Sequence, residues 1–150
     1  MSMPDLATDR QRWMSLLAKA PDALLDRLFA GVGPEPAFDW VRPPELGSVM
    51  VRGRTGGTGA AFNLGEMTVT RCALRLGSGE TGHAYVQGRS KAKARQAALV
   101  DALMQGPRAA AVRAAVLDPL AQALAEAART RAAKAAATKV EFFTMVRGDD

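Results

Sequence analysis

Residues 66–105 restrict the fold more than any other stretch, because the hydrophobic period changes within them from two to that of a helix. Residues 66–76 alternate, with one face made of Thr68, Thr70, Cys72, Leu74 and Leu76. Gly77 and Gly79 supply the positive φ of a short turn before a second strand at 81–87. From Ser90 the apolar residues follow helical spacing. The stretch predicts an antiparallel hairpin followed by a helix.

Cations crowd the start of that helix. Arg89, Lys91, Lys93 and Arg95 occupy its first turns, where the helix dipole is positive and each cation costs roughly 0.3–1 kcal/mol. Lys91 and Arg95 are also a like-charge pair one turn apart. A bound anion would relieve both costs. The alternative is that these long side chains extend into solvent, where salt screens them.

A glycine-rich segment precedes the hairpin. Its backbone is freed by Gly56, Gly57 and Gly59, and its polar groups are Arg52, Arg54 and Thr58. Such a loop can wrap an anion, although it lacks the GK[ST] ending of a P-loop. A plain hairpin connection is the alternative.

The remaining segments complete a predicted α+β domain over residues 1–137. Thr8 and Gln11 have capping-box spacing and open a helix pair over 8–31. Two short strands follow at 37–42 and 48–54, separated by Pro43-Pro44, which a central strand would not tolerate. With the hairpin they predict a four-stranded antiparallel meander over 37–88, followed by C-terminal helices over 90–137. A chain of 150 residues is long enough to bury a core of its own.

The C-terminal segment, residues 138–150, is unusually apolar for a chain end. It carries Phe142, Phe143, Met145 and Val146, followed by Arg147. We predict an extended segment that either adds a strand to its own sheet or docks on a partner protein. These five residues are the candidate docking residues.

Charge and reactive residues limit the function. The net charge is +5, divided as −2 over residues 1–40, +6 over 41–100 and +1 over 101–150, so an anionic ligand or partner surface is expected. Cys72 is the single cysteine and the sequence has no membrane-length apolar run, which favours a cytoplasmic protein.

Catalytic groups are sparse. The single histidine, His83, and the two carboxylates Glu66 and Glu80 form no constellation in the sequence. We predict a binding module or subunit with no catalytic residue, metal or cofactor, and inactive alone. A stand-alone nucleic-acid-binding module is the alternative, but Tyr85 is the sole aromatic residue between Gly65 and Gln105 on which a base could stack.

Several motifs resemble one known family. They are Trp13-Met14, Gly56–Gly59, Thr70-Arg71, Gly88-Arg89 with Lys91, the segment 101–105 and, most specifically, the segment 142–149. Over nearly the whole chain these resemble the PhnG family, the G subunit of bacterial carbon–phosphorus lyase.

The resemblance implies a subunit of a core complex built with the H, I and J subunits for phosphonate degradation. In that system the G, H, I and L subunits are implicated in the first step, in which a phosphonate displaces adenine from ATP to give ribose 1-phosphonate 5-triphosphate. The nucleosidase chemistry is attributed to the I subunit, and the iron–sulfur chemistry belongs to the J subunit. One cysteine could not hold such a cluster here. Arg54, Arg71, Arg89 and Lys91 would then hold phosphate, of ATP or of the ribose triphosphate, or pair with acidic residues of a neighbouring subunit.

Overall fold

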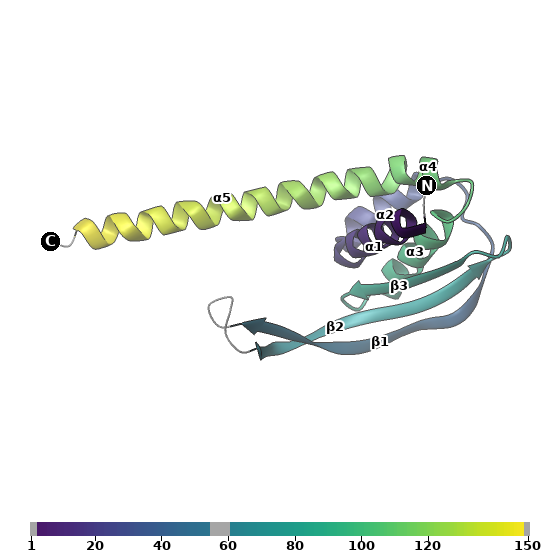
Figure 1. Cartoon of the computed structure of the whole chain (residues 1–150), viewed down its shortest axis with the longest axis horizontal. Coiled ribbons are helices and arrows are strands. Elements are labelled where there is room, and N and C mark those ends of the chain that lie inside the picture. Colours follow the sequence, from purple (N-terminus) through teal and green to yellow (C-terminus); the bar gives the residue numbers. More distant parts are fainter. Residues whose placement is uncertain (1–2, 55–60, 149–150) are drawn as a thin grey trace.

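The computed structural model describes residues 3–54 and 61–148, with side chains described over 7–52 and 65–140. The order of elements is α1 (Met3–Lys19), α2 (Asp22–Ala30), β1 (Phe38–Arg54), β2 (Ala61–Leu76), β3 (Thr81–Gln87), α3 (Lys91–Leu103), α4 (Ala109–Val112), the π-helical segment η2 (Arg113–Leu117) and α5 (Asp118–Gly148). The helices lie on one face of the sheet, and α5 extends far beyond the rest of the molecule (Figure 1).

The sheet has three antiparallel strands in the order β1-β2-β3, so the prediction of four strands is wrong. The segments 37–42 and 48–54 form one strand that runs through Pro43-Pro44. Two register shifts, between Trp40 and Arg42 and between Arg42 and Glu45, accommodate the prolines. Because β1 is an edge strand, the missing proline N–H groups remove no hydrogen bond that the sheet requires.

The predicted hairpin between β2 and β3 is present. Thr70 pairs with Val86 and Cys72 with Ala84, and the turn closes through a hydrogen bond from Leu76 N to Glu80 O at 2.9 Å. Since β3 pairs with β2 only over Val69–Arg75, the other half of β2 continues with β1 as a two-stranded projection.

Helix α3 packs against β2 and β3 and is also in contact with α1 and α2 (Figure 1). Ten of its residues are buried, from Lys93 to Leu103 with the exception of Arg95. The core around it includes Trp13, Leu17, Leu25, Leu74, Leu99 and Leu120. Its contact with β3 is closest at Gly82, where an added Cβ would lie 1.9 Å from the carbonyl oxygen of Ala98.

Both ends of the chain differ from the prediction. Helix α1 begins at Met3, so Thr8 lies inside the helix and does not open it. Helix α5 continues without a break to Gly148, so the prediction of an extended segment is wrong over 138–148, and residues 149–150 lie outside the described residues. No glycine or proline interrupts residues 120–147, and extending a formed helix is easier than nucleating a strand with no neighbour to pair with.

The wide turn η2 precedes Pro119. A proline in a helix lacks an N–H and its ring clashes with the carbonyl four residues earlier, here Ala115. Because Ala115 lies within η2, the wider turn accommodates the ring and lets α5 follow directly.

Candidate functional site

The predicted anion-binding residues lie in separate places. Arg52 is exposed and pairs with Asn63 of β2. The helix start lies next to Thr68 of β2, whose backbone carbonyl accepts the Gly88 N–H. Asn63 and Thr68 are five residues apart along the strand, which corresponds to about 17 Å. Residues 56–59 lie outside the described residues, and Arg54 ends β1 with its side chain undescribed. The described part of the structure therefore does not unite the loop arginine with the cations near α3.

The start of α3 is capped by its own chain. Ser90 is the N-cap residue, and its Oγ accepts the backbone N–H of Lys93 at 3.0 Å. The adjoining hollow contains two carboxylates and is lined by Asp22, Ala23, Asp26, Ser90, Ala92, Lys93 and Gln96. The amide of Gln96 donates to Asp26 at 2.7 Å. These carboxylates repel phosphate, so this hollow does not fit an anion.

Lys93 is buried, although its place among the cations of the helix start suggested an exposed side chain. Its Nζ donates to Gln87 O at 3.1 Å and to Ala18 O at 3.5 Å, and lies 3.6 Å from Asp22 Oδ1. Burial lowers the pKa of Lys93, and Asp22 opposes that shift. Gln96 and Val100 follow Lys93 by three and seven residues, so all three lie on one face of the helix. This spacing could have predicted the burial of Lys93 from the sequence.

Arg89 and Lys91 remain exposed beside this helix start. Neither forms an ion pair with any residue that the structure describes. Arg95, in contrast, pairs with Glu35. Arg89 and Lys91 are therefore the predicted cations available to an external anion at this position.

Arg71 lies elsewhere, on the sheet face opposite the helices. Its Nε is 3.0 Å from Glu45 Oε1, which also lies 3.7 Å from Arg42. With His83 and Tyr85 the two arginines border an open hollow of about 400 Å³. An exposed pair of this kind contributes at most about 1 kcal/mol, so an external anion could displace Glu45. Arg42 was not predicted, since it is distant from Arg71 in sequence.

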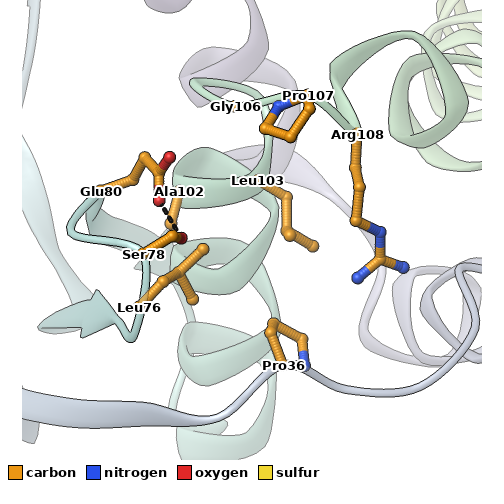
Figure 2. A pocket seen from close by; sticks show the side chains of 9 residues that line it. All are labelled: Pro36, Leu76, Ser78, Glu80, Ala102, Leu103, Gly106, Pro107 and Arg108. Carbon is orange, nitrogen blue, oxygen red and sulfur yellow. Dashed lines mark hydrogen bonds between the residues drawn. The ribbon is translucent and has the colours of Figure 1, made fainter.

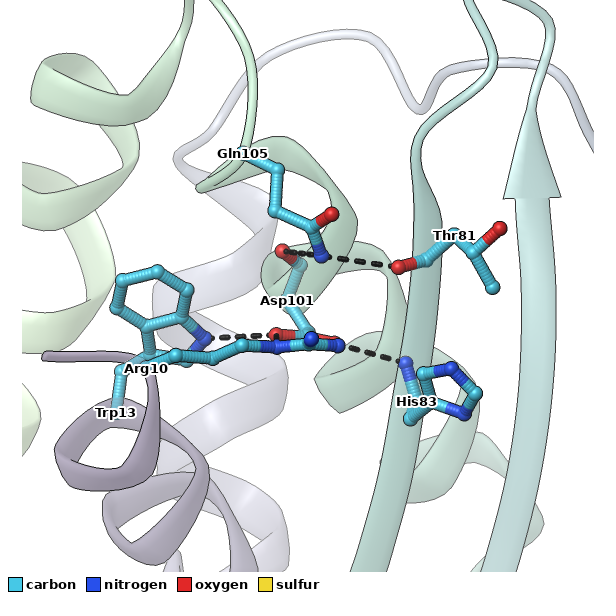
Figure 3. Close-up of polar contacts among 6 residues, drawn as sticks. All are labelled: Arg10, Trp13, Thr81, His83, Asp101 and Gln105. Atoms are coloured by element: carbon cyan, nitrogen blue, oxygen red, sulfur yellow. Dashed lines mark hydrogen bonds and ion pairs between the residues drawn. The ribbon is translucent and has the colours of Figure 1, made fainter. Parts of the chain in front are cut away.

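The carboxylate of Asp101 has no exposed surface and lies among the polar contacts drawn in Figure 3. Arg10 donates to both of its oxygens, at 3.1 and 2.9 Å, Trp13 Nε1 donates at 2.8 Å and the backbone N–H of His83 at 2.8 Å. The hydrogen bonds with Asp101 raise the pKa of Arg10. A carboxylate with all these donors and no access to solvent joins α1, α3 and β3 and is not available as a catalytic base.

Gln105 extends this centre. Its side-chain amide donates to Thr81 O at 2.9 Å and to Asp101 O at 3.1 Å (Figure 3). The amide therefore fixes the end of α3 to the start of β3.

A small cavity of about 160 Å³ lies where the β2–β3 turn meets the end of α3 (Figure 2). Its walls are largely apolar, with Glu80 on one side and Arg108 on the other. The hydroxyl of Ser78 donates to Glu80 and lowers the pKa of that carboxyl, while Arg108 donates to Val32 O at 2.9 Å. A carboxylate of lowered pKa is a weak base near neutral pH.

Among the residues that the structure describes, no group of three His, Cys, Asp or Glu side chains could hold a metal ion. None of the helices there is both long and apolar enough to span a membrane.

Comparison with known proteins identifies the family. The family described as "Phosphonate metabolism protein PhnG" matches residues 8–148. The chain belongs to the PhnG family. The Alpha-D-ribose 1-methylphosphonate 5-triphosphate synthase subunit PhnG of Rhizobium meliloti (strain 1021) is 45% identical over 141 residues, which are 94% of this chain and 90% of that protein.

The PhnG resemblance inferred from the sequence is thereby confirmed, and the structure shows what several of its residues do. Trp13, Asp101 and Gln105 meet in one hydrogen-bonded centre. Thr70 donates to Gly88 O at 2.8 Å, which fixes the backbone before Arg89. Residues 142–148 of the terminal motif lie in the last turns of α5, where side chains fall outside the described residues.

Proposed function

We propose that this PhnG chain is a non-catalytic or assisting subunit of the carbon–phosphorus lyase core complex. In that role it supports formation of ribose 1-phosphonate 5-triphosphate from ATP and a phosphonate, with release of adenine, in the cytoplasm with the H, I and J subunits. The observation that carries this proposal is the 45% identity, over 94% of the chain, to a synthase subunit of that name.

The geometry supports an assisting role. Asp101 and Lys93 are fixed inside the fold by hydrogen bonds, and His83 lies exposed on the bare sheet face. Among the described residues these groups form no nucleophile–base pair. Chemistry on ATP would then depend on groups from other subunits.

The test is co-expression with the H, I and J subunits, followed by size exclusion with light scattering and, with the L subunit added, an assay of adenine release from ATP and methylphosphonate. We expect the isolated chain to be folded and inactive, and the complex to contain it and to release adenine. Failure of the chain to join the complex would refute the proposal, as would adenine release by the chain alone. Salt-sensitive RNA binding by the isolated chain, without assembly, would favour the nucleic-acid module instead.

Two double variants address the predicted residues. Phe142→Ala with Phe143→Ala is expected to weaken assembly, because residues 138–150 are proposed to dock on a partner. Arg89→Gln with Lys91→Gln distinguishes the two roles considered for these cations, which are phosphate binding and contact with a neighbouring subunit. Loss of adenine release within an intact complex would indicate phosphate binding, whereas loss of assembly would indicate an interface. Arg27→Gln, at an exposed position on α2, is the control.

A further inference from the structure

The outer edge of β3 is closed by side chains of α3. Each of three backbone groups on that edge is bonded to a polar side chain of the helix, in the pairs His83 N–H with Asp101 at 2.8 Å, Thr81 O with Gln105 at 2.9 Å and Gln87 O with Lys93 at 3.1 Å. An open strand edge is a template on which another chain can pair. Helix α3 therefore removes β3 as such a template.

The outer edge of β1, at the other side of the sheet, points its backbone groups outward. Thr68 O accepts the N–H of Gly88, the residue after β3, at 2.9 Å, so the backbone groups of Thr68 point toward β3. Ser48 lies opposite Thr68 in the register of β1 with β2. Because opposite residues of an antiparallel pair either exchange hydrogen bonds or point away from each other, the N–H and C=O of Ser48 point away from β2.

Leu46 and Met50 have the same orientation as Ser48, because the register has no shift between Glu45 and Val51 and the direction alternates along the strand. Among the described residues, the outward backbone groups of these three residues have no hydrogen-bond partner. The side chains are uncovered as well, with Leu46 47% and Met50 48% exposed. An added strand binds this combination of unpaired backbone groups and apolar side chains at every second position.

This part of β1 lies where the sheet becomes a two-stranded projection. Beyond Val69, β2 has no pairing with β3, and β1 and β2 continue past the end of β3 (Figure 1). Two strands alone are marginally stable in water, whereas a third strand stabilises them. At the other end, Pro43-Pro44 and the register shifts beside them limit the open edge, since proline has no N–H to donate.

We propose that an extended segment of another subunit pairs with β1 over residues 45–51 and continues the sheet, with apolar side chains beside Leu46 and Met50. This inference rests on the proposed function, since it takes the partner from the same complex. A second copy of β1 is a poor occupant, because residues 41–100 carry a net charge of +6 and two such sheets would repel each other. A helix would leave the backbone groups of β1 unpaired, because its own groups are bonded internally.

Ser48→Pro and Ser48→Ala form a matched pair in the full chain, compared by co-purification with the H, I and J subunits. The proline removes the outward N–H and no hydrogen bond to β2, since that N–H points away from β2. The alanine removes the hydroxyl and keeps the backbone donor. Circular dichroism checks that each variant stays folded.

Leu46→Lys and Val41→Lys are a second pair, which tests the side chains beside the edge. Both place a lysine at an exposed apolar position of β1, but Val41 precedes Pro43-Pro44 and lies outside the proposed pairing. Lysine on a strand edge opposes pairing with another strand.

Hydrogen exchange distinguishes an added strand from contact by side chains alone. It is measured over residues 45–51 in the isolated chain and in the wild-type complex. The outward amides of Leu46, Ser48 and Met50 should exchange at least about tenfold more slowly in the complex, because they become hydrogen-bonded.

We expect Ser48→Pro and Leu46→Lys each to reduce the co-purified chain by at least about tenfold, and Ser48→Ala and Val41→Lys to assemble like the wild type. Wild-type assembly by both Ser48→Pro and Leu46→Lys would overturn the inference and leave the proposed function standing. Unchanged exchange over residues 45–51 in the complex would do the same. A dimer of the isolated chain that Ser48→Pro abolished would also overturn it, since the occupant would then be a second copy. Failure of the wild type to assemble would count against the proposed function itself.

Discussion

Asp101 shows how one residue can connect distant parts of this chain. Its carboxylate has no exposed surface and receives hydrogen bonds from α1 and from the backbone of β3. Buried charge is tolerated only when it is paired and hydrogen-bonded. Asp101 therefore sets how α1, α3 and β3 meet.

Replacing Asp101 with asparagine should lower the free energy of unfolding by about 3 kcal/mol. The amide removes the charge that pairs with Arg10 and places N–H groups where Arg10, Trp13 and His83 also donate. Urea denaturation followed by circular dichroism measures the change. Asp39→Asn, at an exposed position, is the control, and equal stability of the two variants would contradict the role given to Asp101.

Cys72 should be chemically inert in the folded chain. Burial raises the pKa of its thiol to about 11, which lowers the thiolate fraction near pH 8 by about 100-fold relative to an ordinary thiol. Iodoacetamide at pH 8 should therefore modify the native chain at least about 100-fold more slowly than the chain in concentrated urea. Equal rates in the two states would show that the thiol is accessible.

The raised pKa of Cys72 also determines the direction in which the stability of the fold changes with pH. The folded-state pKa of Cys72 lies above its ordinary value of 9.0, so the folded state holds the thiol proton more tightly. The stability contributed by the protonated thiol is complete below about pH 9 and is lost as pH rises toward about 11.

At the scale of elements, the contact between β3 and α3 depends on a single glycine. A Cβ at Gly82 would lie 1.9 Å from Ala98 O and 2.9 Å from Ala102 Cβ, whereas a Cβ at Gly77 would meet nothing within 4 Å. These two glycines therefore form a matched pair for mutation.

Gly82→Ala should lower the free energy of unfolding by about 3 kcal/mol, because strand and helix have to move apart. Gly77→Ala should change it by less than about 0.5 kcal/mol. Thermal and urea denaturation measure both. A neutral Gly82→Ala would mean that β3 and α3 do not pack as closely as the structure places them.

At the scale of the whole molecule, α5 divides into a part that belongs to the core and a part that does not. Leu120 is fully buried, whereas Ala133 is exposed on the projecting part. Alanine has the highest helix propensity, so the projecting part is helical without tertiary contacts of its own. Its stability should therefore be independent of the core.

Ala133→Pro tests this independence. The proline should reduce the helical signal at 222 nm and leave the urea midpoint nearly unchanged. The free energy of unfolding of the core should stay within about 0.5 kcal/mol of the wild type. Leu120→Ala, in the buried part, should cost about 2–5 kcal/mol. A large shift of the midpoint by Ala133→Pro would show that the projecting helix contributes to the fold.

The sequence by itself determined the features that depend on neighbouring residues. The hairpin of β2 and β3 followed from period-two alternation and from the turn glycines, of which Gly79 has the predicted positive φ and Gly77 does not. The start of α3 followed from the change to helical spacing at Ser90. The family followed from short motifs, above all the segment 142–149. Each of these signals lies within about ten residues, where local propensity and spacing suffice.

The tertiary structure decided the rest. Pro43-Pro44 did not end β1, because an edge strand tolerates missing donors. Phe142 and its neighbours continued a helix, because no further strand among the described residues was there to pair with them. Arg10, Trp13 and Asp101 meet only after folding, as do Lys93 and the carbonyl groups around it. Contacts between residues about 90 apart leave no periodic signal in the sequence, since burial and hydrogen bonding across elements depend on how the elements pack.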